Sequence, residues 1–191
     1  MVKILGISGS PRRRGNSELL LDRALEGASR AGAVVEKIVL NELCLKPCQG
    51  CGGCARTARC VIKDEMRSVY RKVDESDALV VASPVYFGSV SAQVKIMIDR
   101  FQPYWIKKYI LKRPASKKDR KGIFLCVAGS DKRAFFANAR SIIKIFFVTL
   151  NIGYFGGIFC GRCEGPGEIK RKGPVLKRSF EMGMKLAKSL S

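Results

Sequence analysis

Short apolar runs alternate with amphipathic stretches along the whole chain of 191 residues. The apolar runs are brief and continuous, as buried parallel strands are. They predict five strands, at Val2–Ile7, Val34–Leu40, Ala78–Ala82, Ile123–Ala128 and Tyr154–Phe159. The stretches between and after them predict helices near residues 17–31, 64–75, 91–110, 133–150 and 174–190. This alternation indicates an α/β protein with a parallel sheet covered by helices on both faces.

Capping signals support these helix boundaries. We expect Asn16 or Ser17 to cap the first helix, Asp64 the second and Ser91 the third, while Pro174 stands near the start of the fifth. Five strand–helix units predict a doubly wound five-stranded parallel sheet of the flavodoxin-like order 2-1-3-4-5, with a ligand site at the carboxyl ends of the strands. A chain of this length predicts a single domain, residues 1–191. A cysteine-rich loop at residues 43–62 is predicted as an insertion after strand 2.

The run from Ser8 to Glu18 has the features of an anion-binding loop. It joins a strand to a helix, so backbone N–H groups and the helix dipole favour an anion there. Its serines and asparagine add donors, and Arg12, Arg13 and Arg14 add positive charge. It contains neither the G-x-x-x-x-G-K-[ST] nor the G-x-G-x-x-G pattern. Such a loop suits the single phosphate of a mononucleotide such as FMN. The alternative is a capped helix behind a Gly-Ser turn, with solvated arginines.

A second loop, residues 83–91, follows the third strand on the same edge of the predicted sheet. Pro84 stiffens it, Gly88 permits a close backbone approach, and Tyr86 and Phe87 offer aromatic faces to a planar heterocycle. Taken alone, the string also fits a turn whose two aromatic side chains pack into the core. Together with the first loop at the matching position, it favours a flavin site.

At this point the chain resembles a known family. The strings G-x-S-G-S-P-R-x3-N-S, from Gly6, and S-P-V-Y-F-G-S-V-S-A-Q-x-K-x3-D-R, from Ser83, are similar to those of the NADPH-dependent FMN reductases, which are flavodoxin-like. The resemblance implies two groups of FMN-binding residues. Around the phosphate stand Ser8, Ser10, Pro11, Asn16 and Ser17, with Arg12 beside them; along the ring stand Pro84, Val85, Tyr86, Phe87 and Gly88, with Gly129 and Ser130 at its far edge. Asp99 and Arg100 match a D-R pair that we expect to be structural or interfacial.

Five of the eight cysteines fall between residues 44 and 60. Four of them, Cys48, Cys51, Cys54 and Cys60, have the spacing C-x2-C-x2-C-x5-C. The spacing of the first three cysteines matches that of bacterial ferredoxins, and Cys60 supplies a fourth ligand in the absence of a second run. Zinc is the rival, although it more often binds two separated cysteine pairs. Unmetallated thiols remain a further alternative. The spacing favours an iron–sulfur cluster.

This cysteine string, combined with the flavin loops, resembles the iron–sulfur flavoproteins. The resemblance implies a 4Fe–4S cluster on Cys48, Cys51, Cys54 and Cys60, FMN as the second redox centre, and a homodimer or tetramer. It also implies that ferredoxin supplies electrons, which pass from cluster to flavin and on to a small acceptor. One alternative is an NAD(P)H-dependent FMN or quinone reductase with a structural, zinc-type cysteine site. Another is a non-catalytic flavodoxin-like binding module.

The remaining cysteines are less informative. Cys160 and Cys163 form a C-x2-C pair after the last strand, which we expect to be free thiols, with a labile redox pair near the flavin as the alternative. Cys126 lies in an apolar strand and is expected in the core, and Cys44 has no assigned role. The chain contains no histidine, which excludes imidazole acid–base chemistry.

The net charge of +20, from 36 basic and 16 acidic residues, favours an acidic partner such as ferredoxin. Nucleic acid is a weak prediction, because no recognition motif accompanies the charge. No apolar run has the length of a membrane span, and we expect a cytoplasmic protein. The basic stretch 112–121 predicts a solvated connection. Residues 101–105, Phe-Gln-Pro-Tyr-Trp, predict an exposed apolar patch for pairing subunits.

Overall fold

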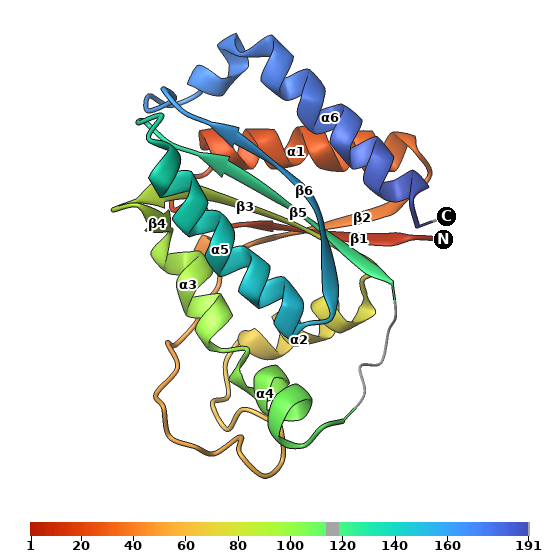
Figure 1. The fold of residues 1–191 in the computed structure, drawn as a ribbon, viewed down its shortest axis with the longest axis vertical. Coiled ribbons are helices and arrows are strands. Elements are labelled where there is room, and N and C mark those ends of the chain that lie inside the picture. The colour runs from red at the N-terminus through yellow and green to blue at the C-terminus, as the bar shows by residue number, and fades with distance from the viewer. Residues whose placement is uncertain (114–118, 191) are drawn as a thin grey trace.

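The structure is a computed structural model that describes residues 1–113 and 119–190 (Figure 1). Residues 114–118 of the predicted basic connection lie outside the described residues. The strands are β1 (Lys3–Ser8), β2 (Val34–Val39), β3 (Ala78–Tyr86), β4 (Ser89–Val90), β5 (Arg120–Val127) and β6 (Ile152–Cys160). The α-helices are α1 (Asn16–Arg30), α2 (Met66–Glu75), α3 (Ala92–Asp99), α4 (Gln102–Trp105), α5 (Arg133–Thr149) and α6 (Gly173–Lys188). Short helical turns are η1 (Leu40–Glu42), η2 (Ile106–Ile110) and η3 (Glu168–Arg171).

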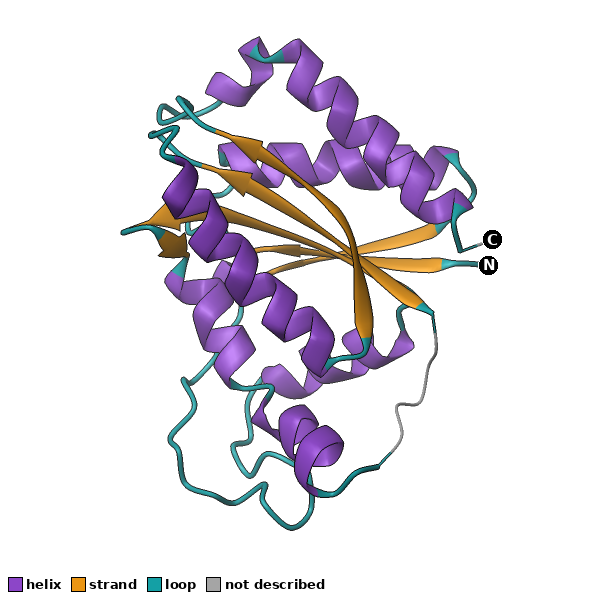
Figure 2. Ribbon diagram, in the orientation of Figure 1, coloured by secondary structure: helices purple, strands orange, loops and turns teal. Residues whose placement is uncertain are grey.

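Five parallel strands form the sheet in the order β2-β1-β3-β5-β6. This confirms the predicted order, since β5 and β6 are the fourth and fifth of the long strands. Figure 2 shows the twisted sheet between two layers of helices, with α1 and α6 on one face. None of the helices in the described ranges combines the length and apolarity needed to cross a membrane.

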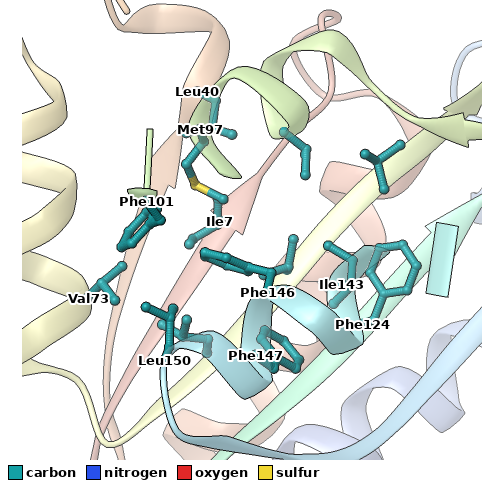
Figure 3. Packing of buried hydrophobic residues seen from close by; sticks show 14 of the residues in the cluster. Ile7, Leu40, Val73, Met97, Phe101, Phe124, Ile143, Phe146, Phe147 and Leu150 are labelled. Atoms are coloured by element: carbon teal, nitrogen blue, oxygen red, sulfur yellow. The ribbon is translucent and has the colours of Figure 1, made fainter. Parts of the chain in front are cut away.

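Two apolar cores fill the space on either side of the sheet. The core beneath α2, α3 and α5 contains Ile7, Met97 and Phe146, which converge in Figure 3. Phe101 belongs to this core as well, with its ring centroid 5.0 Å from that of Phe146. The prediction of an exposed apolar patch at residues 101–105 is therefore wrong for Phe101: burying its ring stabilises the fold more than exposing it would.

The predicted third helix, 91–110, is broken into α3, α4 and the π-helical η2. Ser91 caps α3 as predicted, accepting a hydrogen bond from Val94 N (3.3 Å). The chain leaves the helix at Arg100 and Phe101 and restarts with Pro103 in the first turn of α4. Proline has no N–H to continue the ladder, and its ring clashes with the preceding turn, so a continuous helix is disfavoured there.

The predicted second loop is instead a β-hairpin. β3 continues past Ala82 to Tyr86 and pairs with β4 through Val85–Val90 and Tyr86–Ser89. Phe87 and Gly88 make the two-residue turn, both with positive φ (49° and 73°), as the tight turns of twisted hairpins require. The hairpin projects from the carboxyl edge of the sheet, beside the label β4 in Figure 1.

The two helices on the far face, α1 and α6, cross at two glycines. A Cβ atom on Gly183 would lie 1.8 Å from Ala24 O, and one on Gly27 would lie 2.0 Å from Phe180 O. Only glycine permits this approach of the two backbones. The crossing holds α6 over α1, and α1 begins at the loop predicted to bind phosphate.

Candidate functional site

A pocket of about 430 Å³ lies at the carboxyl edge of the sheet and is called the carboxyl-edge pocket below. Of the residues predicted to bind FMN, it is lined by Ser10, Arg12, Asn16, Ser17, Pro84, Val85, Tyr86 and Gly129. Further lining residues are Arg13, Arg14, Gly15, Val127, Ala128, Cys163, Glu164 and Pro166. Four segments of the chain, residues 10–17, 84–86, 127–129 and 163–166, therefore meet at one concave site, as expected for the carboxyl ends of parallel strands.

The first loop forms the cationic wall of this pocket. The Ser10 hydroxyl donates to Arg12 O (2.8 Å) and accepts from Arg12 N (3.1 Å), which closes a tight turn. A Cβ atom on Gly15 would lie 2.6 Å from the Ser10 hydroxyl oxygen, so a side chain there would open the turn. The first helical hydrogen bond runs from Leu19 N to Gly15 O (3.0 Å), which leaves the amides at the start of α1 to donate to an anion.

Glu18, only 2% exposed, anchors the loop from inside the first turn of α1. Its carboxylate accepts from Arg14 N (2.7 Å) and Lys37 Nζ (3.0 Å) and pairs with Arg13 (3.2 Å). Burial alone would raise the pKa of Glu18, but the Lys37 ammonium and the Arg14 amide outweigh it and lower that pKa. The loop is thus built on a buried, ionised carboxylate.

Asn16 does not cap α1, contrary to prediction. Gly15 occupies the cap position, and no side chain caps that helix. The Asn16 amide instead donates to Gly165 O (2.8 Å) and accepts from Ile169 N (3.2 Å). These long-range bonds tie the first loop to the segment after β6. The Asn16 side chain therefore joins two segments of the pocket wall.

Five of the predicted FMN residues do not line the pocket: Ser8, Pro11, Phe87, Gly88 and Ser130. Ser8 is buried at the end of β1, and the Ser130 hydroxyl accepts from Lys132 N (3.2 Å). Phe87 is fully exposed at the hairpin tip, so the alternative that both aromatic side chains pack in the core is wrong. Glu164 was missed by sequence reasoning, because only the folded chain brings its carboxylate within 3.3 Å of a Cβ placed on Gly129.

A second pocket, about 260 Å³, is lined by all four cysteines of the predicted cluster motif and is called the cysteine pocket below. Cys48 and Cys51 are exposed, while Cys54 and Cys60 are half-buried. The chain curls around the pocket with Gly50 and Gly52 at φ of 62° and 69°, a conformation that favours glycine. Cysteines up to twelve positions apart in the sequence thus line one pocket.

A buried ion pair fixes the base of this loop. Arg100, 1% exposed, donates from both terminal nitrogens to Asp64 (2.6 and 3.0 Å) and also to Lys46 O (2.7 Å). Asp64 also accepts from the amides of Lys46 (3.0 Å) and Met66 (3.2 Å), so it supports the start of α2, although Glu65 and not the predicted Asp64 occupies the cap position. Of the predicted D-R pair, Arg100 therefore has a structural role. Asp99 instead forms an ion pair with Lys95 on the surface (2.9 Å).

The chemistry of the cysteine pocket suits a cationic centre. Burial, followed by the neighbouring cysteines Cys60, Cys48 and Cys51, raises the pKa of Cys54. Within residues 1–113 and 119–190, no three Cys, Asp or Glu side chains lie close enough together to hold a single metal ion. Arg100 also lines the pocket, and its buried Nε has no hydrogen-bond acceptor among the described residues. Four thiols around one pocket, with the Arg100 guanidinium beside them, fit an iron–sulfur cluster.

The two pockets share no lining residue among those described. The carboxyl-edge pocket lies at the strand tips, whereas the cysteine pocket lies against α4 at the bottom of Figure 1. A single copy of the chain therefore holds the two sites apart.

Comparison with known proteins agrees with this arrangement. Residues 2–155 match the family described as NADPH-dependent FMN reductase. An iron–sulfur flavoprotein of Archaeoglobus fulgidus is 35% identical over 98% of this chain and 80% of its own length. Iron–sulfur flavoprotein MJ1083 of Methanocaldococcus jannaschii is 31% identical over 97% of this chain and 96% of its own.

The fold is shared more widely. The solved structure of an NAD(P)H:quinone oxidoreductase from Methanothermobacter marburgensis superposes with a TM-score of 0.75 over 96% of this chain and 95% of that one, at 18% identity. The sequence matches, the sheet order and the four cysteines around one pocket lead to the same assignment. The chain belongs to the NADPH-dependent FMN reductase family of FMN-dependent oxidoreductases and, within it, to the iron–sulfur flavoproteins.

Proposed function

We propose that the chain binds FMN in the carboxyl-edge pocket and a 4Fe–4S cluster in the cysteine pocket, and passes electrons between them. The observation that carries this proposal is the presence of two separate pockets, one lined by four cysteines and one lined by the phosphate-type loop. FMN supplies two-electron chemistry and the cluster one-electron chemistry, so the pair converts between the two.

The residues of the carboxyl-edge pocket divide the work of holding FMN. The amides at the start of α1, the Ser10 hydroxyl and the Arg12 side chain receive the phosphate. Pro84, Val85 and Tyr86, at the end of β3, present the wall for the ring. FMN would supply the redox chemistry, and the protein would bind and orient it. Such a protein needs no imidazole for acid–base catalysis, which is consistent with a chain that has no histidine.

The separation of the two pockets supports a homo-oligomer as the working form. Within one copy, electrons would have to cross from α4 to the strand tips (Figure 1). A dimer or tetramer that places the cysteine pocket of one copy against the carboxyl-edge pocket of another shortens that path. Exposed apolar side chains on α5, Ile145 and Val148, are available for such an interface.

The electron donor is, on this proposal, an acidic protein of the ferredoxin class, and the final acceptor is a small molecule. The net charge of +20 favours an acidic protein surface. Arg56 and Arg59 lie in the cysteine loop itself, so positive charge accompanies the entry point for electrons. NAD(P)H remains the alternative donor.

Substitution of one ligand separates the two centres. In Cys51→Ala we expect loss of iron and sulfide with FMN largely retained, because Cys51 lines only the cysteine pocket. Cys44→Ala is the matched control, since Cys44 is exposed in the same loop but lines neither pocket. Metal and flavin analysis of anaerobically purified protein gives the answer. Iron retained by Cys51→Ala, or lost equally from Cys44→Ala, refutes the ligand assignment.

A further inference from the structure

Cys160 and Cys163 stand at the end of β6, and the proposed electron path uses neither of them. Ala128, at the end of the neighbouring strand, donates to Cys160 O (2.9 Å) and accepts from Cys163 N (3.0 Å). In a regular parallel ladder one residue separates two such partners, but here Gly161 and Arg162 both do. Arg162 has a φ of 50°, so this is a bulge.

The bulge sets the two thiols side by side. Residues that flank one partner in a parallel ladder point to the same face of the sheet. Accordingly, Cys160 and Cys163 belong to the same apolar core, the one beneath α1 and α6. The Lys172 ammonium donates to Gly161 O (2.7 Å) and Arg162 Nε donates to Asp131 (2.7 Å), which hold the bulge from both sides.

Both thiols are hidden from solvent, at 4% and 3% exposure. Burial, followed by the neighbouring Cys160, raises the pKa of Cys163 to about 11. The Cys163 thiol is therefore protonated at neutral pH, and burial shields both side chains from reagents in the bulk solution.

Access to the pair comes from one direction. Cys163 lines the carboxyl-edge pocket, together with Ala128 and Gly129, whereas Cys160 is not among the lining residues. A molecule held in that pocket is the one that contacts Cys163. On the proposed function, which this inference rests on, that molecule is FMN.

We propose that Cys160 and Cys163 form a reversible dithiol–disulfide couple that exchanges two electrons with FMN in the carboxyl-edge pocket. Two S–H bonds break and one S–S bond forms. The two electrons and the released protons pass to the oxidised ring, which becomes the dihydro form; the reverse step reduces the disulfide and reoxidises the flavin. No other oxidant or reductant is needed.

Cys126 is the matched control. It is fully buried like the pair, but it lies on β5 in the opposite core, beneath α5. It lines neither the carboxyl-edge pocket nor the cysteine pocket. Cys126→Ser therefore changes a buried thiol without touching the pair.

The test uses the full chain carrying Cys51→Ala, so that no cluster supplies electrons. Thiol-reduced protein is mixed without air with one equivalent of oxidised FMN, and disulfide-containing protein is mixed with one equivalent of photoreduced FMN. Flavin absorbance is followed, and the peptide containing residues 160 and 163 is analysed by alkylation and mass spectrometry. Whichever couple has the lower potential, one of the two mixtures reacts.

We expect one disulfide gained or lost per flavin reduced or reoxidised in this background and in its Cys126→Ser variant. Cys163→Ser should show no flavin change. Bound FMN with no matching change in thiols in either mixture overturns the couple. Failure to bind FMN at all contradicts the proposed function instead, so the two failures are distinguishable.

Discussion

Single buried charges hold both loops in place. Arg100 with Asp64 fixes the base of the cysteine loop, and Glu18 with Lys37 fixes the phosphate-type loop. A buried charge that loses its partner is expensive, because the interior does not solvate it. Both pairs join segments far apart in the sequence, which is why spacing alone does not reveal them.

The Glu18 pair gives a prediction with a defined pH dependence. Lys37→Met should lower the free energy of unfolding by about 1–3 kcal/mol at neutral pH, since Glu18 stays buried with fewer partners. In the native protein the lowered pKa of Glu18 contributes stability at neutral pH that is lost as the pH falls through it. Without Lys37, two of the causes that lower the pKa of Glu18 are lost, so we expect this pKa to rise and the deficit to shrink in acid.

Urea denaturation at several pH values measures this difference. Lys95→Met, which breaks the exposed pair with Asp99, is the control and should cost less than about 1 kcal/mol at any pH. A Lys37→Met deficit that is equally large in acid would show that the charge of Glu18 is not its cause.

At the scale of elements, the five long strands, their order and the alternating helices follow from the sequence pattern. The breaks do not. The hairpin of β3 and β4 was predicted as a loop because Ser83-Pro84 is typical of turns, yet the strand continues by pairing with Ser89 and Val90. The split at Arg100 depends on burial of Phe101, a tertiary contact. Glu164 entered the pocket in the same way, through folding alone.

The contact between helices α1 and α6 is the one most sensitive to a glycine-to-alanine substitution, which adds one carbon atom. In Gly183→Ala the new Cβ would meet Ala24 O at 1.8 Å, so the helices must move apart. We expect a loss of about 1–3 kcal/mol in the free energy of unfolding, measured by urea denaturation.

Gly173→Ala is the control, because a Cβ there meets no atom within 4 Å at the start of the same helix. Its stability should stay close to that of the parent protein. Equal losses in the two variants would argue against a close crossing.

At the scale of the whole molecule, the charge of +20 sets how partners approach. We expect the rate of reduction by an acidic ferredoxin to fall roughly 10-fold or more between low and moderate salt, because ions screen long-range attraction. Stopped-flow spectroscopy measures it. A neutral small reductant, used as the control, should show little dependence on salt. A ferredoxin rate indifferent to salt would contradict steering by this surface.

The central claim is that one chain carries both a flavin and an iron–sulfur cluster. It is tested most directly by measuring iron, inorganic sulfide, zinc and FMN in protein purified without air. The account predicts about four iron and four sulfide with about one FMN per chain, and no stoichiometric zinc. FMN with zinc and no iron, or neither centre, would contradict it.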